Sequence, residues 1–243
     1  MWYALTWPLM RCFLRAAFAV LGGFRRHGAR HVPRTGGVLI CPNHVCDADP
    51  PAVAIALPRG AWFMAKEQLF DIPVLGPLVR FFHGFPVRRD SADRAALRRA
   101  EELLKAGEAV VIFPEGGGNP EATLQPLYPG AMMIALRTGV PVIPVALANT
   151  HRVWPYGRNL PRRSGVPVSV TFGPPLDLSD LKGTRGAAEA ATARLAETLA
   201  AMLGQPVPQG KPAPRDENSG ADGPAAGDAP VAKPPLPPVP RPR

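Results

Sequence analysis

The strongest constraint on the fold is a series of short apolar segments separated by segments with helical periodicity. Residues 109–113 (A-V-V-I-F) form the clearest predicted strand. Five further segments have strand character, namely 38–41, 61–65, 84–87, 142–147 and 166–172. Helices are predicted over residues 91–105 (capped by Ser91), 130–138 and 187–203. Strands that alternate with helices favour an α/β fold, a single domain with a mixed, largely parallel sheet flanked by helices.

The composition divides the chain into three parts. Residues 205–243 hold 12 of the 32 prolines and almost no large apolar side chains. This segment cannot bury enough apolar surface to offset its ordering entropy, so a disordered Pro-rich tail is predicted. Residues 29–204 are long enough to form one well-buried globular domain. Residues 1–28 are both apolar and basic, and we expect them to form a separate, membrane-associating helical segment.

The N-terminal segment is predicted to be an amphipathic helix. On a continuous helix four arginines fall within an arc of about 100°, namely Arg11, Arg15, Arg25 and Arg26. The opposite side is apolar and contains Leu9, Phe13, Ala16, Val20 and Phe24. Two arginines near the middle are costly in a helix that spans a bilayer but are tolerated in a helix that lies on its surface. A helix that covers the soluble core and a transmembrane span are the alternatives.

The charge distribution favours membrane lipids over nucleic acid as a partner. The net charge is +9, and no acidic residue precedes Asp47. The N-terminal arginines alternate with apolar residues, and the chain has no nucleic-acid-binding motif, so no nucleic-acid partner is expected. A basic and apolar N-terminus suits the anionic cytoplasmic face of the cell membrane, with the protein bound as a peripheral or monotopic protein.

The cysteines make a disulfide framework or a zinc site improbable. There are three of them, Cys12, Cys41 and Cys46, and no C-x-x-C spacing. This pattern is typical of a protein from a reducing compartment. We therefore expect no metal in this protein.

The first candidate catalytic segment is Asn43-His44-Val45-Cys46-Asp47-Ala48-Asp49, directly after a predicted strand. A neutral imidazole is a natural general base for a hydroxyl group, and a carboxylate on its other nitrogen fixes the tautomer. The four residues between His44 and Asp49 allow the carboxylate to fold back onto the ring. A histidine and an aspartate at this spacing also arise by chance, so the pair alone is a weak indication.

Two further segments have features of anion-binding sites. Glu115, Gly116, Gly117 and Gly118 follow the clearest strand, and consecutive glycines allow backbone N–H groups to approach an anion closely. An ordinary glycine-rich turn is the alternative. Lys66 ends one predicted strand, and Arg88 and Arg89 end another. Guanidinium groups match the geometry of phosphate, although a solvated basic edge would look the same.

Taken together and in this order, these segments resemble the glycerolipid acyltransferase superfamily, and specifically the lysophosphatidic acid acyltransferase family. Asn43-His44 with Asp49 is similar to its H-x4-D motif, with Cys46 where a serine is common. Residues 66–69 with 86–89, residues 113–116 and residues 140–145 are similar to three further motifs. The resemblance covers about residues 30–175.

The resemblance implies direct acyl transfer from acyl-CoA or acyl carrier protein to the hydroxyl of a lysophospholipid, without any other cofactor, metal or acyl-enzyme. It implies catalytic roles for His44 and Asp49. It also implies substrate binding by Arg89, which takes the place of the family's phosphate-binding arginine. Asn43, Lys66, Arg88, Glu115 and the three glycines that follow Glu115 are the other candidate substrate-binding residues.

The chain departs from the family pattern after Gly116. The family usually continues with Thr-Arg-Ser, whereas this chain has Gly117-Gly118-Asn119. A second phosphate-contacting arginine is therefore missing, so an acceptor other than 1-acyl-glycerol-3-phosphate is an alternative. A membrane-bound lipid-binding scaffold without catalysis is another, but it would not require His44 and Asp49. A thiolate mechanism through Cys46 is a third.

Overall fold

The computed structural model describes residues 2–73, 75–88, 93–119, 121–155, 157–158 and 160–212. In the N-terminal helix, side chains are described from Pro8 onward except that of Met10. The helices are α1 (Trp2–Leu21), α2 (Asp49–Ala56), α3 (Leu75–Phe81), α4 (Arg94–Lys105), α5 (Gly130–Thr138), α6 (Thr150–Val153) and α7 (Ala187–Leu203), with 3-10 turns η1 (Ala29–His31), η2 (Glu67–Phe70) and η3 (Ser179–Leu181).

The strands form one seven-stranded sheet. They are β1 (Phe24–His27), β2 (Val38–Pro42), β3 (Trp62–Lys66), β4 (Gly84–Val87), β5 (Ala109–Val111), β6 (Val142–Ala148) and β7 (Val168–Phe172), in the spatial order β1-β7-β6-β2-β5-β3-β4. The five strands from β6 to β4 are parallel to one another. β7 is antiparallel to β6, and β1 is parallel to β7. The prediction of a single α/β domain with a mixed, largely parallel sheet is confirmed.

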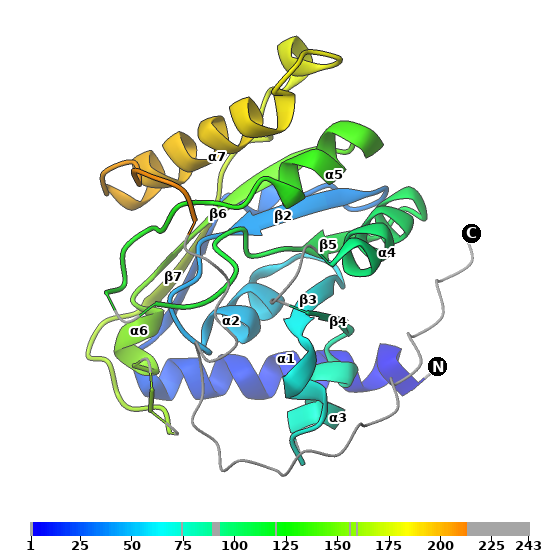
Figure 1. The fold of residues 1–243 in the computed structure, drawn as a ribbon. Helices are drawn as coiled ribbons and strands as arrows, with labels where there is room; N and C mark the ends of the chain where they lie inside the picture. Colours follow the sequence, from blue (N-terminus) through cyan, green and yellow to red (C-terminus); the bar gives the residue numbers. More distant parts are fainter. Residues whose placement is uncertain are drawn as a thin grey trace.

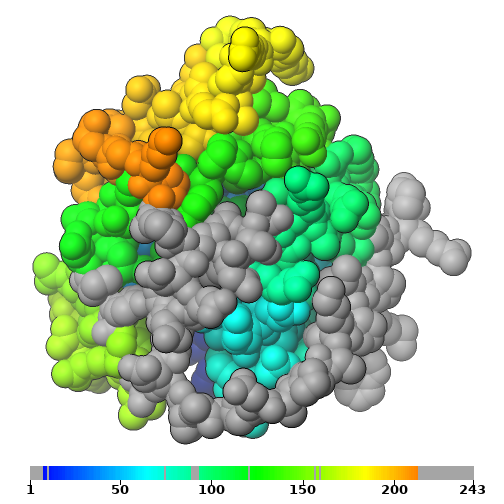
Figure 2. Space-filling model, in the orientation of Figure 1, coloured from blue at the N-terminus to red at the C-terminus, as the bar shows by residue number. Residues whose placement is uncertain are grey.

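Helices cover both faces of the sheet, and the central strands are buried on both faces (Figure 1). In β2, Val38 and Ile40 point toward the layer that contains α1 and α2, while Leu39 and Cys41 point toward α4, α5 and α7. This explains why β2 and β5 are continuous apolar runs in the sequence. The space-filling view shows α7 and α5 over the upper side of the molecule, with α4 beside them (Figure 2).

Three local predictions are wrong. Phe24, Arg25 and Arg26 lie in β1, an edge strand paired with β7, and not on the N-terminal helix. Asp49 is the first residue of α2 and not part of a loop. The cap of α4 is Asp93, whose carboxylate accepts hydrogen bonds from the N–H groups of Ala95 and Ala96 at 3.0 Å each, and Ser91 lies outside the described residues.

The N-terminal helix α1 is docked on the domain through its basic side. Arg11 donates hydrogen bonds to the carbonyl oxygens of Ile55 and Leu57 at 3.1 and 2.8 Å, and Arg15 donates one to Ile55 at 3.3 Å. These carbonyls belong to the C-terminal end of α2, where the helix carries partial negative charge. Phe18 is buried in the core beside them. Arg11 and Arg15 therefore contact the protein, although Arg15 is still exposed to solvent.

The opposite side of α1 is apolar and exposed. Leu9, Phe13 and Val20 are 69, 68 and 63% exposed. The sequence thus predicted the two sides of this helix, and the structure leaves the apolar side uncovered by the protein. In the part of the chain that the structure describes, no helix combines the length and the apolar character needed to cross a membrane.

The first residue of the predicted C-terminal tail contacts the folded domain. This residue, Gln205, accepts a hydrogen bond from Leu124 N at 2.7 Å through its side-chain oxygen. Its side-chain nitrogen donates to Ala122 O at 3.3 Å. This residue therefore belongs to the folded domain, whereas the predicted disorder of residues 213–243 concerns positions outside the described residues.

Candidate active site

The candidate site residues gather at the carboxyl-end edge of the parallel strands. The His44–Asp49 segment follows β2, Phe113 and the glycines follow β5, and Lys66 and Arg88 stand at the ends of the paired strands β3 and β4. β2 and β5 are direct neighbours, so their following loops must meet. In open α/β sheets ligands bind at this edge.

His44 and Asp49 form the predicted pair. His44 Nδ1 lies 2.9 Å from Asp49 Oδ2. The same oxygen accepts hydrogen bonds from the N–H groups of Val45 and Cys46 at 2.6 and 2.8 Å. Because Oδ2 acts as an acceptor for both amides, Nδ1 carries the proton and Nε2 keeps its lone pair. Asp49 is fully buried and lies at the N-terminus of α2, where negative charge is stabilised.

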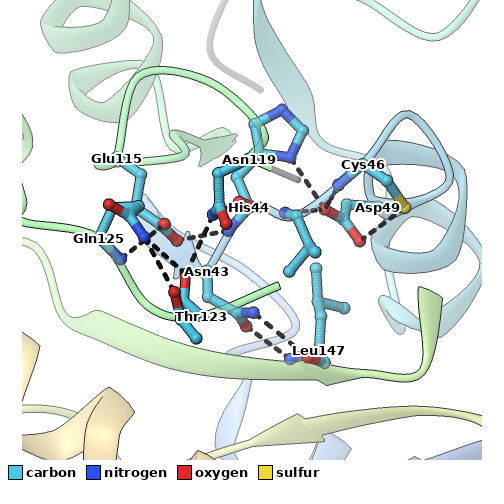
Figure 3. A network of polar contacts seen from close by, with 10 residues as sticks. Asn43, His44, Cys46, Asp49, Glu115, Asn119, Thr123, Gln125 and Leu147 are labelled. Carbon is cyan, nitrogen blue, oxygen red and sulfur yellow. Dashed lines mark hydrogen bonds and ion pairs between the residues drawn. The ribbon is translucent and has the colours of Figure 1, made fainter. Parts of the chain in front are cut away.

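The imidazole is held in one orientation. The ring of Phe113 packs against it with centroids 4.3 Å apart and planes inclined by 34°. The second ring nitrogen points away from the polar network, as Figure 3 shows. The side chain of His44 is 10% exposed, so most of the ring is covered, and among the described residues no hydrogen bond to this nitrogen is found. The arrangement is that of a general base whose tautomer and direction are fixed.

Asn43 connects the histidine loop (residues 43–48) to the strand β6. Its side-chain nitrogen donates to Leu147 O at 3.2 Å, and its side-chain oxygen accepts from Leu147 N at 2.7 Å. Asn43 is only 3% exposed. Since both polar atoms of this amide are engaged with β6, the geometry favours a positioning role over the predicted contact with substrate.

Glu115 joins the histidine loop to the loop that follows β5. Its Oε1 accepts a hydrogen bond from His44 N at 2.6 Å, and its Oε2 accepts one from Gln125 N at 2.9 Å. Burial raises the pKa of Glu115 to about 8, although the two N–H donors favour its charged form, and the nearby charge of Asp49 raises the pKa further. Glu115 thus holds the backbone that carries His44, and its contact with substrate stays a prediction.

The raised pKa of Glu115 predicts a pH-dependent stability. In the unfolded chain this carboxyl has its ordinary pKa near 4.5, so between pH 4.5 and 8 the folded protein holds a proton that the unfolded chain loses. The stabilisation is therefore complete below about pH 4.5 and is lost as the pH rises through about 8. We expect the melting temperature of the wild type to fall over this range relative to that of Glu115→Gln, as calorimetry from pH 5 to 9 would measure.

A matched control for this prediction is Glu121→Gln, since Glu121 is an exposed glutamate of the same loop. This variant should retain the pH dependence of the wild type. If Glu115→Gln and the wild type instead show parallel melting curves against pH, Glu115 is ionised throughout and its burial does not control its protonation.

The glycine loop (residues 114–119) packs directly on the histidine loop. Asn119 N donates to Val45 O at 3.2 Å, and a Cβ atom on Gly118 would lie 2.9 Å from that same oxygen. Gly116 has φ +80°, and a Cβ there would meet the ring of Tyr128 at 2.8 Å. A larger residue at position 118 would therefore push the two loops apart, and one at position 116 would displace Tyr128.

The glycines differ in the availability of their N–H groups. Gly116 N donates to Phe113 O at 3.1 Å and so closes a turn. Within the described part of the chain, the N–H groups of Gly117 and Gly118 have no hydrogen-bond partner. Gly117 and Gly118 therefore have N–H groups that could bind an anion beside His44, which stays a prediction, while Gly116 shapes the loop.

The basic candidates lie on the far side of this edge. Arg88 Nε is 3.9 Å from Glu67 Oε2, and Arg88 N donates to Asp93 Oδ2 at 2.9 Å. The Arg88 side chain is about half exposed. Lys66 is adjacent, because its strand partner is Val87. Arg89, the predicted phosphate-binding arginine, lies outside the described residues.

The three cysteines differ in environment. Cys41 and Cys46 are buried, and burial raises the pKa of both thiols. The Cys46 thiol lies 3.9 Å from Asp49 Oδ1, and the charge of Asp49 raises the pKa of this thiol further. A neutral, buried thiol is a poor nucleophile, so the geometry opposes the thiolate alternative. Cys12, by contrast, is exposed on α1.

Sequence reasoning missed one segment of this edge. Thr150 and His151 follow β6 at the same edge of the sheet, in the short helix α6. Thr150 is fully buried. Burial lowers the pKa of His151, and Arg152 lowers it further, while the charge of Asp49 acts in the opposite direction. The position of residues 149–151 directly after a buried strand was the available indication. Among the described residues, no cluster of three or more His, Cys, Asp or Glu side chains could hold a metal ion.

The chain is similar in sequence to known acyltransferases. The chain is 27% identical over 190 residues to a 1-acyl-sn-glycerol-3-phosphate acyltransferase of Limnanthes douglasii, a match that covers 72% of this chain and 66% of that protein. It is 31% identical over 134 residues to the Bacillus subtilis (strain 168) protein of the same name, covering 55% of this chain and 66% of that protein. The chain thus spans just under two thirds of the length of these relatives.

The fold has a counterpart among solved structures. The crystal structure of the 1-acyl-sn-glycerophosphate (LPA) acyltransferase PlsC from Thermotoga maritima matches with a TM-score of 0.68 and 25% sequence identity, over 83% of this chain and 80% of that one. A family model described as "Acyltransferase" matches residues 23–148, which include β1 through β6 and the His44–Asp49 pair. Because this match covers more than half of the 243 residues, the chain belongs to the acyltransferase family.

Proposed function

We propose that the protein transfers a fatty acyl group from acyl-CoA or acyl carrier protein to the hydroxyl of 1-acyl-glycerol-3-phosphate, which yields phosphatidic acid. The observation that carries this proposal is the contact of 2.9 Å between His44 Nδ1 and Asp49 Oδ2, which leaves Nε2 free at the carboxyl-end edge of the sheet. The names of the matched relatives support the choice of acceptor.

In the proposed mechanism His44 is the general base. Its Nε2 takes the proton of the acceptor hydroxyl as that oxygen attacks the thioester carbonyl. The new ester C–O bond forms, the C–S bond breaks, and the leaving thiolate receives the proton from the imidazolium. Asp49 holds the ring and stabilises its charged form. General-base catalysis of this kind contributes about 10²–10⁴-fold to the rate.

The negative charge on the thioester oxygen needs donors. The N–H groups of Gly117 and Gly118 are suitable, because they lie in the loop that packs on Val45 beside His44. Removing one such donor typically costs about 10²–10³-fold in rate. No acyl-enzyme is required, since the buried Cys46 thiol is held next to Asp49 and not exposed to substrate.

The acceptor phosphate is assigned to the basic residues that end β3 and β4. Lys66 and Arg88 lie at this position, and Arg89 follows directly in the sequence. The absence of an arginine after Gly116 favours a second candidate, an acceptor whose phosphate is substituted or absent. Both candidates use the same chemistry at His44.

Lipid mass spectrometry separates the two candidates. The purified protein is incubated with acyl-CoA and, in separate reactions, with 1-acyl-glycerol-3-phosphate, other lysophospholipids and monoacylglycerol. Phosphatidic acid as the dominant product would support the proposal. Acylation of the other lysolipids alone would support the second candidate, and no acylated product from any donor and acceptor pair would refute catalysis.

We further propose that the protein binds the cytoplasmic face of the cell membrane through α1. The exposed side chains of Leu9, Phe13 and Val20 would enter the interface, and their burial is favourable. Since Arg11 and Arg15 hydrogen-bond to α2, this contact is apolar and rests little on charge. It differs in this respect from the electrostatic contact that the sequence suggested.

A further inference from the structure

One corner of the molecule is basic and exposed. Four described residues between α6 and β7 form it, namely Arg158, Leu160, Arg162 and Arg163, and we call it the basic corner. All four are exposed, and Leu160 is the most exposed of the large apolar side chains that the structure describes, at 77%. The sequence has no acidic residue between Glu121 and Asp177. Accordingly, no ion pair of these arginines is found among the described residues.

The basic corner is attached to the C-terminal end of α1. Ser164, the next residue, donates to Leu21 O through its backbone N at 2.7 Å and through its hydroxyl at 3.0 Å. The neighbouring Val20 belongs to the exposed apolar side of α1. In Figure 1 the segment after α6 descends beside this end of α1, and in Figure 2 it forms the lower left part of the molecule.

These features match the chemistry of an anionic bilayer surface. An exposed leucine among arginines can enter the interface while the guanidinium groups bind phosphate groups of lipids. α1 supplies apolar contacts but keeps Arg11 and Arg15 on α2, so the electrostatic attraction must come from another part of the surface. An acidic protein would use the charges but would leave Leu160 and the adjoining apolar side of α1 uncovered.

We infer that the basic corner is a second membrane contact, which binds the headgroups of anionic phospholipids next to the apolar contact of α1. This inference rests on the proposal that the enzyme works at a bilayer. The corner lies a few residues beyond α6, which follows β6 at the carboxyl-end edge. Two contacts fix the orientation of a body on a surface where one leaves it free to rotate, so this edge would face the lipid.

The test compares two charge-matched double variants of the full chain. Arg158→Gln/Arg163→Gln removes two charges from the basic corner. Lys182→Gln/Arg185→Gln removes two exposed charges between η3 and α7, on the opposite side of the molecule. Co-sedimentation is measured with vesicles of phosphatidylcholine, with and without phosphatidylglycerol. The corner variant should bind the anionic vesicles about 30-fold more weakly, and the control variant should bind them like the wild type.

A third variant and a second binding partner distinguish the alternatives. Leu160→Ser should weaken binding to both kinds of vesicle, because it removes an apolar contact. Equal binding of the corner variant and the control variant to anionic vesicles would overturn the inference. Retained vesicle binding with loss of binding to acidic acyl carrier protein would also overturn it and would identify the corner as a donor-docking surface.

The vesicle measurement requires no turnover, so it is independent of the proposed function. Acyl transfer to a short-chain, water-soluble acceptor is measured in parallel. A corner variant that keeps this acyl transfer but no longer binds anionic vesicles supports the inference. A wild type that binds vesicles through the corner but acylates no acceptor would refute the proposed function and leave the membrane contact intact.

Discussion

The His44→Ala protein is expected to fold like the wild type and to lose acyl transfer by about 10²–10⁴-fold or more. The substitution removes the imidazole that is paired with Asp49, while Asp49 keeps its hydrogen bonds to Val45 N and Cys46 N. Asp49→Asn should be impaired by a similar factor. An amide that donates toward Nδ1 would impose the wrong tautomer and disturb the loop.

Cys46→Ser is the matched control, because it changes one atom of a buried side chain in the same loop. It should retain most of the activity. Transfer rates with saturating acyl-CoA, together with circular dichroism of each variant, check all three proteins. A folded but inactive Cys46→Ser protein would restore the thiolate mechanism, and an active His44→Ala protein would eliminate the general base proposed here.

The Arg11→Met/Arg15→Met protein is expected to be less stable but still able to bind membranes. Three hydrogen bonds to Ile55 O and Leu57 O would be lost, two of them from Arg11. We expect a loss of about 2 kcal/mol, or about 4–8 °C in melting temperature. Binding to vesicles should be retained, because the exposed apolar side of α1 is unchanged.

A double variant of two exposed arginines provides the comparison. Arg25 lies in the edge strand β1 and Arg30 in η1, and the structure gives neither a hydrogen bond to the C-terminal end of α2, unlike Arg26, which donates to Ala56 O at 3.3 Å. Arg25→Met/Arg30→Met should therefore melt close to the wild type. If Arg11→Met/Arg15→Met instead melts like the wild type and no longer binds anionic vesicles, the arginines of α1 contact lipid, and their docking on α2 is wrong.

The sheet was largely predictable because buried parallel strands are continuous apolar runs. The segments at 38–41, 109–113 and 142–147 all became central strands. β1 was not predicted, since its sequence Phe-Arg-Arg-His lies on an edge and has no buried face. Its pairing with β7 is a contact across more than 140 residues, and nothing local encodes it.

The helices show the limits of local patterns more clearly. α2 was missed because its short apolar sequence has no polar side from which a helical period could be recognised. Pro50 and Pro51 after Asp49 were the available indication, since proline is favoured in the first turn of a helix. For α1 the periodicity identified a basic and an apolar side. It could not identify the acceptor carbonyls at the end of α2, which hold Arg11 and Arg15 against the domain.

The catalytic pair was predictable and its surroundings were not. The spacing of His44 and Asp49, with four residues between them, contained enough information to predict their contact. The partners of Asn43 and Glu115 come from other parts of the chain, Leu147 and Gln125. Sequence reasoning assigned both side chains to substrate because it could identify polar residues near the site but not the backbone groups that occupy them.

The unequal burial of the cysteines gives this protein a natural attachment point for a probe. Cys41 and Cys46 are buried thiols with raised pKa, so a maleimide reagent should react with Cys12 alone. Cys12 is exposed on α1, next in sequence to the exposed Phe13. A nitroxide or an environment-sensitive fluorophore at this position would report how deeply α1 enters a bilayer, without any engineered residue in the chain.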